Sequence, residues 1–218
     1  MTAEGQPVLI VVAGPNGSGK TTVTRELLSH RWLDGVAVIN PDEIAQHTFG
    51  DWNSQEAVLQ AAQAAKAERE EALACRRSIA FETVFSAPDK PEYVWRALDA
   101  GFFVRFFFVC TDSPTINAAR VAKRVMEGGH KVEIGKIIDR YAKSVANAAA
   151  ILPFVDRGYV YDNSVDGRSA ELLFRSVEGK LAKTYPAHPR EWAGPMFEAI
   201  ASEAQLSMPP HPQGRRTP

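Results

Sequence analysis

Residues 14–21 place glycines, a lysine and a threonine at the spacing G-x-x-x-x-G-K-[ST], which is that of a phosphate-binding loop. The loop directly follows the apolar residues 8–12, so it lies between a predicted strand and a predicted helix. Glycine lets backbone N–H groups turn inward, and the positive end of the following helix points at the same spot. Lys20 is expected to reach the β- and γ-phosphates of ATP, and the Thr21 hydroxyl is expected to bind Mg²⁺. The predicted nucleotide ligands are Gly14, Asn16, Gly17, Ser18, Gly19, Lys20, Thr21 and Thr22.

An acidic residue stands just after the second predicted strand, residues 36–40. Because ligands of an open parallel sheet bind beyond the carboxyl ends of its strands, Asp42 is expected near the phosphates. We take Asp42 as the candidate general base and substrate ligand, since phosphoryl transfer needs an accepting hydroxyl that is positioned and loses its proton. The alternative is that Asp42 only stabilises the first turn of the next helix. Glu43 is expected to turn away from Asp42, onto a solvated helix face.

The third predicted strand, residues 78–82, brings a second carboxylate to the same edge of the sheet. Glu82 is expected to bind the substrate or to hold Mg²⁺ through water, which makes Thr21 and Glu82 the candidate metal ligands. The alternative is a strand-end carboxylate that bonds only to the backbone. Thr83 and Ser86 follow directly and are candidate contacts for hydroxyl groups of the substrate.

Arg120 and Arg124 lie one helical turn apart on a predicted helix, residues 114–127. Like charges at this spacing repel each other unless an anion lies between them, and a triphosphate would supply that anion. Guanidinium groups suit phosphate and would stabilise the charge of the transferring group, so both arginines are candidate catalytic residues. The alternative is a solvated basic helix face. Arg140 is a further candidate ligand of phosphate or substrate. Asn163 is a candidate ligand of the nucleotide, and the alternative is that it only forms the turn after the last strand.

Strand-like and helix-like segments alternate along the chain, which predicts an α/β fold of the P-loop type, a parallel sheet with helices on both faces. Five strands are expected at residues 8–13, 36–40, 78–82, 102–110 and 159–161. Helices are expected at residues 20–30, 55–77, 88–100, 114–127 and 133–152, with another beginning at Pro41. We predict one domain over residues 1–206, with a helical lid at about 114–152 that hinges at Gly128 and Gly129. A hairpin over 171–185 that turns at Gly179, a helix over 191–205 and a disordered tail over 207–218 complete the prediction.

The formal net charge of −1 gives no reason to expect binding to nucleic acid or to a membrane surface. The N-terminal apolar run is too short for a signal peptide, and the apolar stretch 102–110 is interrupted by Arg105. The two cysteines, Cys75 and Cys110, are expected to fill core space in a reducing compartment. These features predict a cytoplasmic protein.

Seven motifs occur along the chain in one order. They are residues 14–22, 40–44, 81–86, 120–125 and 128–132, Arg140-Tyr141 with Ser144 and Asn147, and residues 161–164. Together they resemble the zeta-toxin family of P-loop kinases, especially its shorter chromosomal members, over roughly residues 8–164.

The resemblance implies a five-stranded parallel sheet with a helical lid. It also implies transfer of the γ-phosphate of ATP to a sugar hydroxyl of UDP-N-acetylglucosamine or a related sugar nucleotide, which blocks cell-wall synthesis. By motif position, Lys20 and Thr21 resemble the phosphate and Mg²⁺ ligands, and Asp42 resembles the base. Glu82 and Thr83 would contact the acceptor, and the two lid arginines would clamp phosphates.

Three functions follow from these features. The leading one is an ATP- and Mg²⁺-dependent kinase of a small molecule. The second is a nucleotide-dependent ATPase or switch that acts through a protein partner, although the chain lacks the Asn-Lys-x-Asp guanine motif and carries arginines in its own lid. The third is a toxin-like protein that an antitoxin protein neutralises by covering the ATP site.

Overall fold

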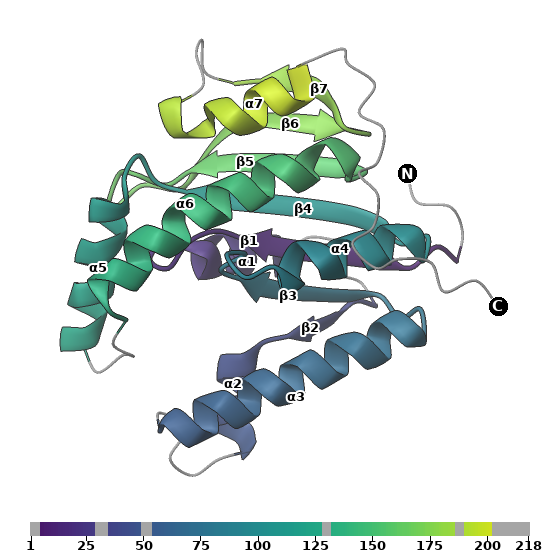
Figure 1. The fold of residues 1–218 in the computed structure, drawn as a ribbon, viewed down its shortest axis with the longest axis horizontal. Helices are drawn as coiled ribbons and strands as arrows, with labels where there is room; N and C mark the ends of the chain where they lie inside the picture. Colours follow the sequence, from purple (N-terminus) through teal and green to yellow (C-terminus); the bar gives the residue numbers. More distant parts are fainter. Residues whose placement is uncertain (1–4, 29–34, 49–53, 128–131, 186–189, 202–218) are drawn as a thin grey trace.

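One sheet of seven strands runs through the protein, in the order β2-β3-β1-β4-β5-β6-β7 (Figure 1). The computed structural model describes residues 5–28, 35–48, 54–127, 132–185 and 190–201, and only the backbone of residues 26–28 and 42. The strands are β1 (Val8–Ala13), β2 (Ala37–Ile39), β3 (Ile79–Thr83), β4 (Phe103–Cys110), β5 (Arg157–Asp162), β6 (Glu171–Val177) and β7 (Lys180–Thr184). Strands β1 to β5 pair in parallel, and β6 and β7 pair antiparallel.

The predicted α/β class and the five parallel strands are confirmed, but the sheet has seven strands and not five. The predicted hairpin forms β6 and β7, and β6 pairs with the outer edge of β5. The hairpin therefore extends the same sheet and supplies partners for the backbone groups along the edge of β5. Its turn holds Glu178 and Gly179 at φ 51° and 73°, and a Cβ at Gly179 would lie 1.8 Å from the main-chain oxygen of Pro153.

Helices cover both faces of the sheet. They are α1 (Lys20–Leu28), α2 (Pro41–Thr48), α3 (Gln55–Ala74), α4 (Asp89–Asp99), α5 (Pro114–Met126), α6 (Ile134–Ile151) and α7 (Gly194–Ala201), with short 3₁₀ turns η2 (Leu152–Phe154) and η3 (Glu191–Ala193). Helices α4, α6 and α7 pack on one face, α1 packs on the other, and α2 and α3 lie together beside the edge strand β2 (Figure 1). No helix in these ranges combines the length and apolarity needed to cross a membrane.

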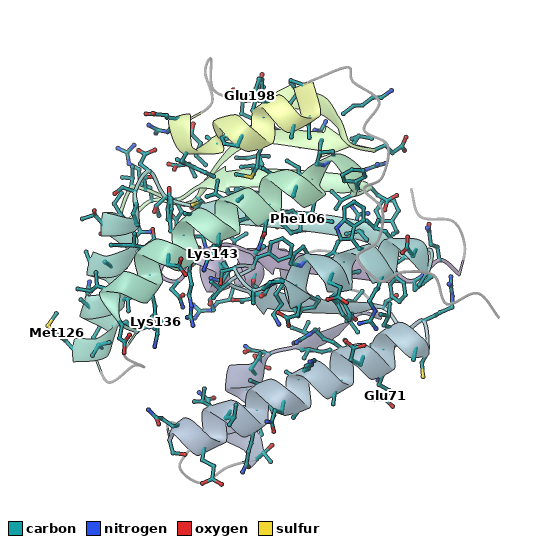
Figure 2. All side chains as sticks on the ribbon, viewed as in Figure 1. Glu71, Phe106, Met126, Lys136, Lys143 and Glu198 are labelled. Carbon is teal, nitrogen blue, oxygen red and sulfur yellow. The ribbon has the colours of Figure 1, made fainter. Side chains whose placement is uncertain are left out.

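The central strand β4 explains how the core forms on both faces. Its side chains alternate, so Phe106 and Phe108 face α4 and α6 while Phe107 faces α1 and stacks on Tyr159 with ring centroids 4.6 Å apart. All three phenylalanines are fully buried, and Figure 2 labels Phe106 between the sheet and these helices. A strand buried on both faces is expected to be almost continuously apolar, as residues 102–110 are.

Several local expectations need correction. Helix α3 ends at Ala74, three residues before the predicted end, because Arg76 adopts a positive φ of 53° that a helix cannot continue. Cys75 is therefore exposed just after α3 and does not fill the core, whereas Cys110 is buried as predicted. The predicted helix over 191–205 is divided into η3 and α7. The predicted hinge glycines, the tail over 207–218 and residues 202–205 lie outside the described residues.

Candidate active site

The phosphate-binding loop connects β1 to α1 with a backbone that requires glycine. Gly17 and Gly19 have φ of 76° and 88°, in the left-handed region that side chains disfavour. A Cβ at Gly17 would lie 2.6 Å from the main-chain oxygen of Asn117, and a Cβ at Gly19 would lie 2.1 Å from Nδ2 of Asn163. The loop is thus packed closely against α5 and against the segment after β5, in a conformation suited to a phosphate cradle.

Three polar side chains hold this loop from different sides. Asn117 of α5 donates to the main-chain oxygen of Asn16 at 2.6 Å, and Asn163 donates to that of Ser18 at 2.8 Å. Arg140 of α6 donates to Oδ1 of Asn16 at 3.4 Å. Sequence analysis identified Asn163 and Arg140 but missed Asn117, which is fully buried. The signal for Asn117 was an amide on the apolar face of an amphipathic helix.

Lys20 lies at the centre of the loop, where Nζ donates to the main-chain oxygens of Gly14 and Pro15 at 2.8 and 2.9 Å. The pKa of Lys20 is lowered from 10.5 to about 8, mainly because the amine is buried; the charge of Glu82 raises this pKa and the charge of Arg124 lowers it. Arg124 is exposed at the surface of α5. The two cations therefore act on the same space, which a bound triphosphate would neutralise.

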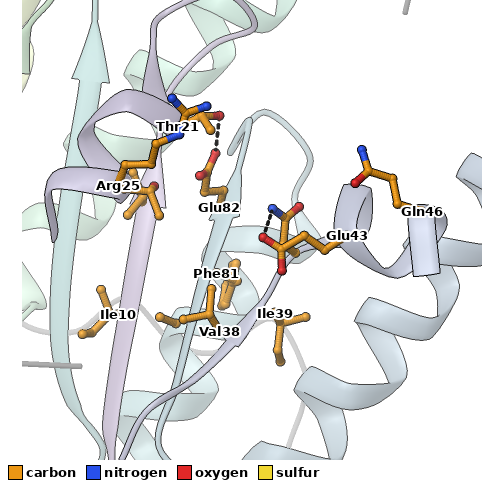
Figure 3. Close-up of a pocket in the computed structure, with 13 residues that line it drawn as sticks. Ile10, Thr21, Arg25, Val38, Ile39, Glu43, Gln46, Phe81 and Glu82 are labelled. Atoms are coloured by element: carbon orange, nitrogen blue, oxygen red, sulfur yellow. Dashed lines mark hydrogen bonds between the residues drawn. The ribbon is translucent and has the colours of Figure 1, made fainter. Parts of the chain in front are cut away.

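The two predicted metal ligands meet. The Thr21 hydroxyl of α1 donates to Oε2 of Glu82, at the end of β3, across 3.1 Å (Figure 3). Hydroxyl and carboxylate oxygens are the donors that Mg²⁺ prefers, and few protein ligands suffice because Mg²⁺ keeps several waters. Within the described part of the chain, no group of three or more His, Cys, Asp and Glu side chains offers an alternative metal site. The oxygens of Thr21 and Glu82 therefore suit Mg²⁺, and metal binding by these two residues stays a prediction.

A cavity of about 280 Å³ opens beside Thr21 and Glu82; we call it the edge cavity (Figure 3). Its lining residues are Ile10, Val12, Thr21, Thr24, Arg25, Val38, Ile39, Asn40, Glu43, Gln46, Ala80, Phe81 and Glu82. Glu43 is exposed, as expected, and it also borders this cavity and accepts a hydrogen bond from Asn40 at 3.2 Å. The backbone of Asp42 lies in the first turn of α2, and its side chain is outside what the structure describes.

Thr83 is the last residue of β3 and directly precedes a loop that turns at Phe85. Thr83 is buried, and its hydroxyl accepts a hydrogen bond from the N–H of Phe85 at 3.2 Å. Phe85 has a φ of 62° and is buried against Phe106, with ring centroids 5.1 Å apart. Thr83 therefore supports the loop from within, while Ser86 follows it in a half-buried position. Contact of either residue with a substrate stays a prediction.

Helix α6 fixes this loop from the outside. The Ser144 hydroxyl lies 2.5 Å from the main-chain oxygen of Val84, and Asn147 donates to that of Phe85 at 2.9 Å. Tyr141, one helical turn earlier, donates to the main-chain oxygen of Thr111 at 2.5 Å. The polar stripe of α6 thus holds the loops that follow β3 and β4.

Arg120 lies among residues that follow β5. Its Nε and Nη2 donate to Oδ1 of Asp166 at 2.8 and 2.5 Å, and its Nη1 donates to the main-chain oxygen of Asn163 at 2.7 Å. From the sequence, we expected an anion shared with Arg124 to neutralise the charge of Arg120. In the structure, Asp166 already forms an ion pair with Arg120. Arg120, Asp166 and Thr22 border a cavity of about 260 Å³, which we call the loop cavity. A catalytic role for Arg120 stays a prediction.

Comparison with known proteins connects this geometry to a family. The family model described as Zeta toxin matches residues 1–164, which include the phosphate-binding loop, Glu82, helices α5 and α6 and Asn163. The chain belongs to the zeta toxin family. By family and fold it is a P-loop phosphotransferase of the toxin type. The hairpin β6–β7 and α7 lie beyond the matched region.

Solved structures of low sequence identity share this fold. The PezAT chromosomal toxin–antitoxin system of Streptococcus pneumoniae matches at 18% identity and a TM-score of 0.55, over 78% of this chain and 71% of that chain. The AvrRxo1-ORF1:-ORF2 complex with ATP matches at 17% identity and a TM-score of 0.60, over 94% of this chain and 67% of that chain. This zeta toxin family member therefore shares its fold with proteins that are less than 20% identical to it in sequence.

Proposed function

We propose that this zeta toxin family member is a kinase that transfers the γ-phosphate of ATP to a hydroxyl of a UDP-N-acetylglucosamine-like sugar nucleotide. The observation that carries the proposal is the contact of Thr21 with Glu82 at the mouth of the edge cavity. A hydrolase needs room only for water next to its phosphates, whereas a kinase needs a second binding space there. The edge cavity supplies that space at the carboxyl ends of the strands.

On the donor side, Lys20, Arg124 and Arg140 surround the loop and would bind the phosphates. The loop cavity lies at the start of α1, next to Thr22, and would hold the nucleoside. Arg120 orders its wall by bonding to the segment that follows β5. We include in the proposal that α5 and α6 close as a lid, because water must be excluded from an activated phosphate.

On the acceptor side, the edge cavity combines an apolar floor with a polar rim. Ile10, Val12 and Ala80 form part of the floor, and Asn40 and Glu43 belong to the rim. A pyranose ring matches this pattern, because its faces are apolar and its edge carries hydroxyl groups. A volume of about 280 Å³ suits the sugar and leaves the rest of a sugar nucleotide outside.

We assign the proton transfer to Asp42, which would accept the proton of the attacking hydroxyl. Its position in the first turn of α2, directly beyond β2, supports the assignment. Glu43 is the rival carboxylate because it borders the edge cavity. Mg²⁺, when held by Thr21 and Glu82, would neutralise charge on the phosphate groups. Lys20 and Arg124 would stabilise the charge that remains.

The first experiment incubates the protein with γ-labelled ATP, Mg²⁺ and a metabolite extract, and then identifies labelled products by mass spectrometry. If the protein is a kinase, we expect one new labelled phosphometabolite. If that product is a phosphorylated UDP-sugar, the acceptor is a sugar nucleotide. Asp42→Asn should remove the product, whereas Glu198→Gln, which changes an exposed carboxylate on α7, should retain it. If the label is released only as free phosphate, the assignment as a kinase is wrong. That result would favour an ATPase that acts through a protein partner.

A second experiment separates the two carboxylates at the start of α2. If Asp42 is the base, Asp42→Asn lowers kcat by about 10²–10⁴-fold while ATP affinity is kept. Glu43→Gln should act mainly on KM for the acceptor, because its side chain borders the edge cavity. The reverse pattern, with kcat lost only in Glu43→Gln, would move the base to Glu43.

We further propose that an antitoxin protein binds this chain in the cytoplasm. The support is the family match and the likeness in fold to PezAT, a chromosomal toxin–antitoxin system. A small protein encoded beside this chain should bind it and relieve any growth arrest that its expression causes. Growth arrest that persists when the two proteins form a complex would contradict neutralisation by that partner.

A further inference from the structure

A third cavity, of about 130 Å³, lies between α3 and α4; we call it the α3–α4 pocket. Its lining residues are Lys66, Arg69, Glu70, Asp89, Lys90, Glu92, Tyr93 and Arg96. It shares none of these residues with the edge cavity or the loop cavity. Its volume is well below the roughly 300–1,000 Å³ of pockets for drug-sized ligands, so a small ion fits and a whole nucleotide does not.

Most of the opposite charges in this pocket neutralise one another. Arg96 binds Glu70 with both prongs of its guanidinium, at 2.5 and 3.1 Å. Lys90 lies 2.5 Å from the carboxylate of Asp89. The hydrogen bond from Arg96 lowers the pKa of Glu70, so this pair stays ionised at neutral pH. These four side chains form a fixed, charged rim.

Arg69 is the exception. Its side chain is only 8% exposed, and its guanidinium carbon lies 5.1 Å from the ring centroid of Phe81. No hydrogen bond or ion pair joins its guanidinium to any residue that the structure describes, and Asp89 and Glu70 act on it only at longer range. The Tyr93 hydroxyl donates to the main-chain oxygen of Arg69 at 2.7 Å, which fixes this turn of α3. The guanidinium of Arg69 is thus held against Phe81 in this cavity, and none of the described residues accepts a hydrogen bond from it.

Burying a guanidinium that has no hydrogen-bonded counter-ion destabilises a fold, whereas a bound anion offsets that cost with charge-assisted hydrogen bonds. We propose that the α3–α4 pocket is a binding site for a small oxyanion of phosphate size, with Arg69 as its main ligand and Lys66 at its mouth. The phosphate group can be free or part of a larger metabolite whose remainder lies outside. The carboxylates of Glu92 and Asp89 at the rim limit the affinity, so binding is expected at millimolar and not nanomolar concentration.

The test measures thermal unfolding of the full chain in inorganic phosphate and in chloride of equal ionic strength. AMPPNP and Mg²⁺ are present throughout, so that the phosphate-binding loop is occupied. Saturating phosphate should raise the melting temperature of the wild-type protein by about 2–4 °C and leave Arg69→Met unchanged. The matched control is Arg77→Met, which alters an exposed arginine just past α3 that faces Glu71 at 3.6 Å, and it should respond like the wild type. Equal phosphate shifts in wild type and Arg69→Met would overturn the proposal.

Two further measurements keep the proposal testable if Arg69→Met folds poorly. In chloride, Arg69→Met should melt at or above the wild-type temperature, because it removes a buried charge that forms no ion pair with the described residues. In the wild-type protein, the Nε–H NMR signal of Arg69, assigned with Arg69→Lys, should shift during a phosphate titration. A signal that does not move would overturn the site. UDP-N-acetylglucosamine replaces phosphate in a parallel titration, and a shift at lower concentration identifies the acceptor as the source of the phosphate group. None of these readouts depends on kinase activity.

Discussion

The pKa of Lys20 leads to a prediction about nucleotide binding. Burial holds this pKa near 8 in the absence of nucleotide, and the charge of Arg124 acts in the same direction. A bound triphosphate places several negative charges beside Nζ, which favours the protonated amine and raises the pKa towards or beyond its ordinary value of 10.5. Binding therefore requires the charged form of Lys20, and the complex takes up a proton wherever the free protein has lost it. Affinity should fall as the pH rises above about 8.

The size of the effect follows from the fraction of Lys20 that is protonated. With a pKa of about 8, roughly three quarters of the free protein carries the charge at pH 7.5 and about one tenth carries it at pH 9. If Lys20 stays protonated in the complex over this range, the affinity for nucleotide falls roughly eightfold, or about 1 kcal/mol.

The assay is isothermal titration calorimetry with AMPPNP and Mg²⁺ between pH 7.5 and pH 9. Two buffers of different ionisation enthalpy at each pH give the number of protons taken up, which should approach one at pH 9. Lys20→Arg is the control, because a guanidinium stays charged throughout this range. An affinity and proton uptake that do not change with pH would refute the assignment. A pH dependence kept in Lys20→Arg would assign the proton to another group.

Three shorter predictions concern the elements that position the site. Asp166→Asn removes the carboxylate that Arg120 binds; because Asp166 is 83% exposed, KM for ATP should rise only about two- to fivefold, measured by steady-state kinetics. Asn147→Leu leaves the main-chain oxygen of Phe85 without its donor and should lower the free energy of unfolding in urea by about 1–3 kcal/mol. Phe106→Ala removes a buried side chain of β4 and should lower the free energy of unfolding by about 3–5 kcal/mol. A loss below 1 kcal/mol in Asn147→Leu or in Phe106→Ala would contradict the contacts described for that residue.

Local pattern was sufficient for much of the architecture. The phosphate-binding loop could be predicted because its glycines, lysine and threonine all act within eight residues, between a strand and a helix that the same sequence specifies. Buried parallel strands such as β4 are almost continuously apolar, so they too are recognisable without a partner. The turn at Gly179 was predictable from glycine alone, but the pairing of the hairpin with β5 was not, because an open strand edge has no local signature.

The candidate site divides in the same way. The types and order of Lys20, Thr21 and Glu82 indicated phosphate and metal chemistry, but only the folded chain brings Thr21 and Glu82, 61 residues apart, to within 3.1 Å. Sequence spacing paired Arg120 with Arg124, whereas Arg120 bonds to Asp166, 46 residues away. Hydrogen bonds form only between atoms that lie close together in space, and ion pairs weaken as the distance in space grows, whatever the separation in sequence.

The sequence by itself determined that this protein has a P-loop, a parallel α/β sheet and membership of a kinase-like family, because each depends on residue types at short, fixed spacings. Only the tertiary structure decided which polar groups became neighbours. It placed Asn117 under the phosphate-binding loop, Glu43 at the edge cavity and Arg69 in the α3–α4 pocket against Phe81. Those outcomes depend on how helices pack on the sheet, and packing is a property of many distant residues acting together.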